Sequence, residues 1–250
     1  MTSHLSPVTG VPLRVAILTS HAAPGVEELL RDPNRGAVYE LAAVISSEIA
    51  FAEMESVEAA GVPIILQPNR RYAADREFDA ELAHLLHHLK ADYLFLVGYE
   101  HLITDPLLEA LPMRILKLHD GVSDALYEGA NETRSTLAIL TDDGKEPLFL
   151  QSQPFPVASL ARDARTWGDA DLLGDYTALH RRWMIRATWG PMLIRAIEFL
   201  VAGTVTIVHD VAWIDGAPGP CRLGASPDVC QKVADTIDVT IPASCPFLRA

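Results

Sequence analysis

The segment 93–121, YLFLVGYEHLITDPLLEALPMRILKLHDG, contains two short apolar runs separated by an amphipathic stretch. Residues 93–97 and 114–118 have the length and composition of buried strands. Residues 105–110 have helical spacing, with Pro106 suited to a first helical position. Parallel strands need a crossover connection between them, so this order predicts a parallel βαβ unit.

The same alternation extends over most of the first 120 residues. Further strands are predicted at 13–19, 40–45 and 62–66, and helices at 25–31, 49–60 and 75–90, with Asp75 and Asp105 as N-caps. This order predicts an α/β fold, a doubly wound, mainly parallel sheet with helices on both faces. Ligands of such sheets bind beyond the carboxyl ends of the strands, which directs attention to 19–25, 98–103 and the residues after 118.

The pattern changes after residue 151. Residues 176–202 predict a long helix interrupted at Gly190-Pro191 and ended by Gly203, and 204–214 alternate like a strand before a turn at Asp215-Gly216. We therefore expect an α/β domain over 1–203 and a small C-terminal extension over 204–250, a strand or hairpin followed by an acidic tail. The tail carries three cysteines, expected as free thiols: Cys221, Cys230 and Cys245.

Charge and composition exclude several classes of function. The 250 residues include 20 Lys+Arg and 33 Asp+Glu, a formal net charge of −13 that disfavours nucleic acids and anionic membrane surfaces. No apolar run approaches the roughly 18 residues of a membrane span, and the first residues lack a signal-peptide pattern, so a cytoplasmic protein is expected. No metal site is expected, because no carboxylate completes a zinc motif around His84, His87 and His88.

Several segments in order resemble the folate-dependent formyltransferases of the glycinamide ribonucleotide formyltransferase type. LVGY at 96–99 resembles the turn that ends a family strand, and ILKLH at 115–119 resembles the strand ending in Asn-x-His. YEGAN at 127–131 and DGKEPLFLQ at 143–151 resemble later family segments. The resemblance covers about residues 13–203 and implies a divergent member with the family's fold.

The resemblance implies transfer of a formyl group from 10-formyltetrahydrofolate to a small amine. This chemistry passes through a tetrahedral oxyanion and needs a hydrogen-bond donor for that oxygen and a group that moves the amine proton. By position, the resemblance implies that His119 is the catalytic histidine, that Lys117 replaces the family asparagine, and that Asp143 is the acid. Asp120 remains an alternative carboxylate.

The resemblance also implies two groups of binding residues. The donor would contact the segment after the first turn, Gly98, Tyr99, Glu100, His101, Leu102 and Ile103. The substrate side would comprise Ser20, His21, Gly25, Asp120, Gly129 and Asn131. The loop 19–25 has one glycine and a proline, and so lacks the free N–H groups with which the family holds a phosphate.

Three functions are compatible with these residues. The leading hypothesis is an enzyme, a formyltransferase that acts on a specialised small amine. A catalytically inactive relative that binds folate or another metabolite is the first alternative. A hydrolase that releases formate from the same donor is the second, because water can replace the amine as the nucleophile.

Overall fold

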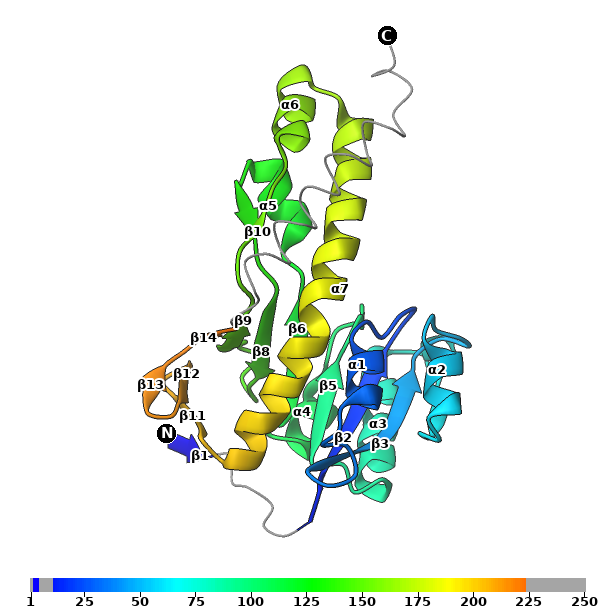
Figure 1. Cartoon of the computed structure of the whole chain (residues 1–250). Helices are drawn as coiled ribbons and strands as arrows, with labels where there is room; N and C mark the ends of the chain where they lie inside the picture. The colour runs from blue at the N-terminus through cyan, green and yellow to red at the C-terminus, as the bar shows by residue number, and fades with distance from the viewer. Residues whose placement is uncertain (1, 5–10, 224–250) are drawn as a thin grey trace.

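The computed structural model describes residues 2–4 and 11–223. Its centre is an eight-stranded sheet with strand order β14-β9-β8-β6-β5-β2-β3-β4 (Figure 1). Five strands run parallel to one another: β2 (Leu13–Thr19), β3 (Tyr39–Ser46), β4 (Ile64–Leu66), β5 (Tyr93–Leu96) and β6 (Ile115–His119). The predicted α/β sheet is therefore confirmed, with each of the five expected strands in place.

The other half of the sheet changes direction next to β6. Strand β8 (Thr136–Leu140) pairs with β6 in antiparallel orientation, and β9 (Leu148–Gln151) pairs antiparallel with β8. Strand β14 (Cys221–Arg222) completes this edge beside β9. As a result, the connection between β8 and β9 lies on the same sheet as the end of β6.

Helices cover both faces of the sheet. Apolar side chains of α1 (Val26–Arg31), α2 (Met54–Ala59) and the second half of α7 (Ala170–Ala202) share one buried cluster with β2, β5 and β6. Those of α3 (Asp75–His88) and α4 (Asp105–Ala110) form a second cluster on the opposite face. This is the doubly wound arrangement that the alternating pattern predicts.

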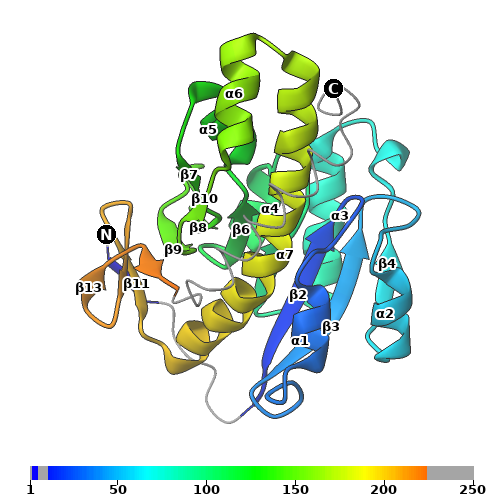
Figure 2. The ribbon, with the colours of Figure 1, turned by 45° about the horizontal axis from the view of Figure 1, so that its top comes forward.

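A small lobe stands above the sheet and has a third buried cluster of its own. It contains α5 (Val122–Glu128), α6 (Ser159–Trp167), the first half of α7 and the short pair β7 (Glu132–Thr133) and β10 (Phe155–Pro156) (Figures 1 and 2). Because α5 begins directly after β6, the lobe lies over the carboxyl end of that strand. Helix α7 runs from the lobe across the sheet.

The C-terminal extension contains a hairpin, one of the two forms expected for it. The alternating residues 204–214 divide into β11 (Val205–Val208) and β12 (Val211–Ile214), which pair in antiparallel orientation. His209 and Asp210, the two residues between these strands, both have positive φ, which allows the chain to reverse direction in a two-residue turn. β1 (Thr2–His4) and β13 (Ala217–Pro218) complete this four-stranded sheet. Cys221 is a free thiol, whereas Cys230 and Cys245 lie outside the described residues.

Helix α7 is continuous, so the predicted interruption at Gly190-Pro191 is wrong. Gly190 allows close packing here, because a Cβ at this position would lie 2.6 Å from Glu28 Cγ.

The N-caps of α3 and α4 are Ala74 and Thr104, one residue before the expected aspartates. None of the helices described is both long enough and apolar enough to cross a membrane.

Candidate active site

Strand β6 presents two basic side chains on one face. Its burial alternates, with Leu116 and Leu118 in the core beneath α7 and Lys117 and His119 half-buried on the opposite side. Residues two apart on a strand point to the same face, as the sequence predicts. His119 is the last residue of β6 and therefore lies at the carboxyl edge of the parallel strands.

A glutamate that the sequence does not single out lies against both side chains. Glu146 Oε1 is 3.0 Å from Lys117 Nζ, and Glu146 Oε2 is 2.8 Å from His119 Nε2. Ala138, which pairs with Lys117 on the intervening strand, leaves room for the glutamate to reach across. The His119 contact is close but poorly aligned, because this buried nitrogen has no hydrogen-bond partner among the described residues.

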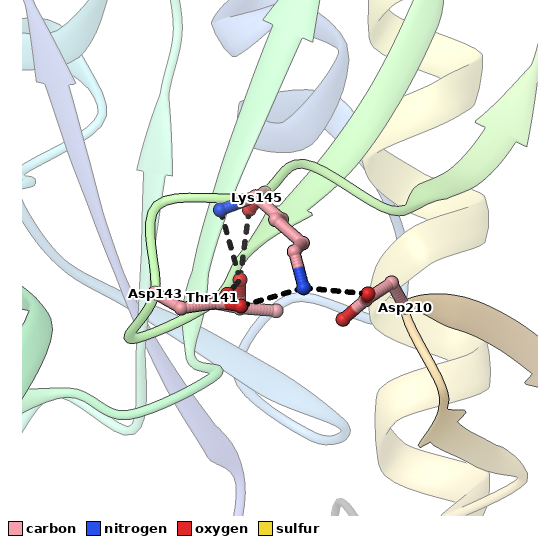
Figure 3. A network of polar contacts seen from close by, with 4 residues as sticks. All are labelled: Thr141, Asp143, Lys145 and Asp210. Atoms are coloured by element: carbon pink, nitrogen blue, oxygen red, sulfur yellow. Dashed lines mark hydrogen bonds and ion pairs between the residues drawn. The ribbon is translucent and has the colours of Figure 1, made fainter.

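The structure does not bring Asp143 to His119. Asp143 lies in the β8–β9 turn, past the end of β8 that pairs with Ile115 and thus at the opposite end of β6 from His119. Its carboxylate is 2.7 Å from Lys145 Nζ, and hydrogen bonds from Lys145 and Thr141 lower the pKa of Asp143 to about 2. Lys145 also contacts Asp210 at 2.7 Å (Figure 3). This network ties the β8–β9 turn to the β11–β12 turn.

An open cleft of about 320 Å³ adjoins Lys117 and His119. Its walls come from the loop after β5, the end of β6, the start of α5 and two residues of α7: Gly98, Tyr99, Glu100, Lys117, Leu118, His119, Asp120, Gly121, Val122, Ser123, Asp124, Arg181 and Trp189. The cleft therefore lies beyond the carboxyl ends of β5 and β6, where ligands of open α/β sheets bind.

The loop 98–104 forms one wall and is held from behind. A Cβ at Gly98 would overlap the carbonyl oxygen of Ala22, so only glycine fits this close approach. Tyr99 is buried and stacks on Phe78, with ring centroids 6.4 Å apart. Glu100 and Leu102 are exposed, and Leu102 retains 76% of its accessible surface. The loop therefore presents one acidic and one apolar residue to solvent, and its other side is packed against Ala22 and Phe78.

A buried carboxylate fixes the far end of this loop. Asp79 Oδ2 accepts hydrogen bonds from the backbone N–H and the hydroxyl of Thr104, each at 2.6 Å. Burial raises the pKa of Asp79, and the two hydrogen bonds from Thr104 oppose that shift. His101 Nδ1 lies 3.0 Å from Asn69 Nδ2. These contacts connect the loop to α3 and to the segment after β4.

Four of the predicted donor-side and substrate-side residues belong to the cleft wall: Gly98, Tyr99, Glu100 and Asp120. The others lie elsewhere. Ser20 is buried, and its hydroxyl accepts a hydrogen bond from the Glu100 N–H at 3.3 Å, so it supports the loop from beneath. The remaining predicted residues do not line the cleft: His21, Gly25, His101, Leu102, Ile103, Gly129 and Asn131.

The carboxylate of Asp120 contacts residues other than His119. Its Oδ1 accepts the Val122 N–H at 3.0 Å and thereby stabilises the start of α5. Its Oδ2 accepts from Arg181 Nε at 2.7 Å. Arg181 reaches the cleft from α7. Glu146 is therefore the only carboxylate of the described residues that contacts His119.

Residues 13–139 match the model of the formyl transferase family. The chain belongs to this family. The match covers β2 to β8 and therefore includes the loop 98–104, Lys117 and His119. Members of the family use 10-formyltetrahydrofolate as the formyl donor.

Individual relatives are distant. The chain is 24% identical over 157 residues to the trifunctional purine biosynthetic protein adenosine-3 of Homo sapiens, over 58% of this chain and 15% of that protein. The corresponding protein of Drosophila melanogaster is 25% identical over 80% of this chain and 15% of its own length. The chain thus spans a small part of these curated relatives.

Solved structures show the same fold. Glycinamide ribonucleotide transformylase 1 from Symbiobacterium toebii superposes with a TM-score of 0.63 at 24% identity, over 82% of this chain and 95% of that one. A formyltetrahydrofolate deformylase from Pseudomonas syringae has the same TM-score at 17% identity, over 82% of this chain and 66% of that one. Both a transferase and a hydrolase by name therefore share this architecture.

Proposed function

We propose that this protein transfers the formyl group of 10-formyltetrahydrofolate to a small amine, with His119 and Lys117 at the reacting atoms and Glu146 as the residue that positions them. The observation that carries the proposal is the contact of one carboxylate with both basic side chains at the cleft. An imidazole suits this role because it gains and loses protons near neutral pH.

The reaction assigns a task to each group. The amine nitrogen attacks the formyl carbon, and the carbonyl oxygen becomes an oxyanion. Lys117 donates a hydrogen bond to that oxygen, and His119 takes a proton from the attacking nitrogen and passes it to the leaving nitrogen of the folate. The products are a formamide and tetrahydrofolate, so atoms and charge balance.

The ion pair between Lys117 and Glu146 makes this assignment workable. An unpaired ammonium beside His119 would repel a second positive charge and oppose proton uptake by the imidazole. Glu146 lies 3.0 Å from Lys117 Nζ and offsets that charge, while its other oxygen faces the imidazole. Lys117 can therefore replace the family asparagine without leaving an uncompensated cation next to the histidine.

In this proposal the donor binds against the loop 98–103. Backbone groups there can hold a pterin, and the exposed Leu102 offers an apolar surface to its ring. The hydrogen bonds that Ser20 and Asp79 make behind the loop hold it in one conformation before the donor arrives. Such preorganisation lowers the entropic cost of binding.

Hydrolysis of the same donor is the second candidate. The cleft is open to solvent beside His119, so water has access to the position that the amine would occupy. The same general base would then deprotonate water, and formate would replace the formamide as product.

A donor-consumption assay tests the proposal. Purified protein is titrated with a stable reduced folate by calorimetry, and 10-formyltetrahydrofolate is then supplied with and without a panel of small amines. We expect binding, and formation of a formamide that depends on the amine. Formate release without any amine dependence would favour the hydrolase. Binding without turnover would favour an inactive binding protein, and absence of both would overturn the proposal.

A further inference from the structure

A second and larger cavity lies at the opposite edge of the sheet from the active-site cleft. Its volume is about 570 Å³, which is within the range of small-molecule sites. Asp92 and Arg114 in its wall directly precede β5 and β6, so it lies at the amino ends of the two strands whose carboxyl ends border the cleft. The rest of the wall of this amino-edge pocket comes from the ends of α3 and α4.

The polar part of this wall is mainly basic. Lys90 and Arg114 contribute permanent positive charges, and His84 and His87, one turn apart near the end of α3, contribute two imidazoles. Asp92 is the one carboxylate among the described residues that line the pocket. The amino-edge pocket therefore has a positive excess, in a chain whose net charge is −13.

The carboxylate of Asp92 already has a hydrogen-bond partner, whereas the two cations have no counter-ion. Asp92 Oδ2 accepts the backbone N–H of Arg14 at 2.8 Å, and the guanidinium of Arg14 pairs with Glu40 at 2.7 Å. Neither Lys90 nor Arg114 forms an ion pair with any residue that the structure describes. An anion bound in this pocket would therefore gain two cations without displacing an internal carboxylate.

The carbonyl groups at the end of α3 do not need these cations either. Basic side chains are common at helix C-termini because they can bind the last carbonyl oxygens. Here the carbonyls of Leu86 and His87 each accept a backbone N–H at 3.0 Å. The carbonyl of Leu89 accepts from Arg14 Nε and Nη2 at 3.1 Å and 3.0 Å. The Lys90 side chain is therefore not required to end the helix.

The backbone beside both cations has an uncommon conformation. Lys90 follows the C-cap of α3 with a φ of 52°, and Met113, which directly precedes Arg114, has a φ of 57°. Residues other than glycine adopt such angles at a cost in stability, and conformations of this kind cluster at ligand sites. Glycine is the usual residue after a helix C-cap, so stability alone does not account for a lysine there.

An apolar floor accompanies the basic residues. Leu86 and Leu111 are buried and line the pocket together with three alanines. An inorganic ion would leave this apolar surface in contact with water, whereas a ligand with an organic part would cover it. The guanidinium, the ammonium and the two imidazoles offer more N–H donors than two carboxylate oxygens readily accept, which favours a phosphate group.

From these observations we infer that the amino-edge pocket binds a small phosphate ester. The phosphate group contacts Lys90 and Arg114, and the organic part of the ligand lies on the apolar floor. His84 and His87 line the same pocket and donate further hydrogen bonds to the phosphate oxygens. This inference goes beyond the proposed function and does not rest on it, because no residue of the active-site cleft takes part.

Calorimetric titration of the full chain with four small probes tests the ligand class. Phenyl phosphate has both the phosphate group and an apolar ring, inorganic phosphate lacks the ring, phenol lacks the charge, and benzoate has a carboxylate in place of the phosphate. We expect phenyl phosphate to bind about tenfold or more tightly than each of the others. Absence of phenyl phosphate binding, or equal binding of any other probe, would overturn the inference.

The double variant Lys90→Asn, Arg114→Gln tests the location of the site. Asparagine tolerates positive φ and both side chains are exposed, so the variant should fold, which its urea unfolding midpoint checks. We expect the affinity for phenyl phosphate to fall about tenfold or more, because both charge-assisted contacts are lost. Equal affinity in the folded variant and the wild type would show that the ester binds elsewhere.

Two control variants remove a single cation outside the pocket. Arg162 is exposed on α6 and forms no ion pair with a described residue, so Arg162→Gln measures the effect of total charge alone. Lys117→Gln removes the cation of the active-site cleft, where an anion could bind instead. Both controls should keep the wild-type affinity for phenyl phosphate. Loss of binding in Lys117→Gln would place the ester in the cleft and overturn the inference.

Discussion

Glu146 gives the site a carboxylate that contacts two basic side chains of one strand. A shared carboxylate orients both groups, and loss of its charge would leave Lys117 without a partner beside His119. The same residue lies in the turn in which Lys145 pairs with both Asp143 and Asp210. This turn therefore contacts both basic residues of β6 and the β11–β12 turn.

Replacing His119 with Ala removes the only imidazole among the described residues that line the cleft. We expect turnover to fall by about a hundredfold or more, because a positioned general base is lost, while folate affinity stays nearly unchanged. Initial rates and a calorimetric folate titration on the same preparation measure the two quantities. Equal turnover in the variant and the wild type would show that the chemistry occurs elsewhere.

Glu146→Gln and Asp143→Asn distinguish the observed carboxylate from the one that the family resemblance implies. Glu146→Gln should lower kcat by about tenfold or more and change its pH profile, with little effect on the KM for the donor. Asp143→Asn, at an exposed turn distant from His119, should leave the shape of that profile unchanged. A larger effect of Asp143→Asn than of Glu146→Gln on kcat and its pH profile would identify Asp143 as the carboxylate that acts with His119.

At the scale of elements, the contact between α1 and α7 depends on two glycines. A Cβ at Gly25 would lie 2.7 Å from the backbone nitrogen of Gly190, and Gly25 has a φ of +89°. Backbone atoms cannot move aside as a flexible side chain can. The start of α1 and the middle of α7 therefore approach each other only if these positions lack a side chain.

We expect Gly25→Ala to lower the free energy of unfolding by about 2 kcal/mol or more, through positive φ and overpacking together. Gly36→Ala is the control, because Gly36 has a φ of +88° but no atom within 4 Å of the added Cβ. Urea denaturation of both variants isolates the packing contribution. Equal losses in the two variants would mean that close packing at Gly25 contributes nothing.

At the scale of the whole molecule, the lobe above the sheet depends on a buried neutral histidine. His180 is fully buried, and its Nε2 and Nδ1 lie 2.7 Å and 3.2 Å from the hydroxyls of Thr133 and Tyr176. Burial lowers the pKa of His180 to about 4. The imidazole therefore joins β7 to α7 in its uncharged form.

This burial predicts a loss of stability in mild acid. The unfolded chain takes up a proton near pH 6.5 and the folded chain only near pH 4, so stability falls as the pH decreases through this window. Relative to neutral pH, this proton uptake by the unfolded chain lowers the free energy of unfolding by about 2 kcal/mol at pH 5. His180→Gln, which does not titrate, should show a smaller drop in the free energy of unfolding between pH 7.5 and pH 5, measured by urea denaturation. Equal drops in the free energy of unfolding for the variant and the wild type would contradict the conclusion that His180 is buried in its neutral form.

Local patterns in the chain are enough to predict the parallel strands and the face that Lys117 and His119 share. Short apolar runs indicate buried strands, and side chains two residues apart on a strand point to the same face. Neighbouring positions in the sequence therefore determine both the strands and the shared face. The place of the site at the carboxyl edge follows from the topology of open sheets.

Glu146 could not be identified in this way, because its contact depends on residues that are distant in the chain. Strand β8 separates β9 from β6, and its pairing with β9 shifts register between Leu137 and Ala138. The register across these strands therefore decides which side chain of the β8–β9 connection reaches His119, and the sequence alone does not give that register. Likewise, Arg181 lies at the cleft because α7 passes from the lobe across the end of the sheet, a packing that local patterns do not give. Local propensity determines the elements, whereas register and packing between distant segments determine which side chains meet.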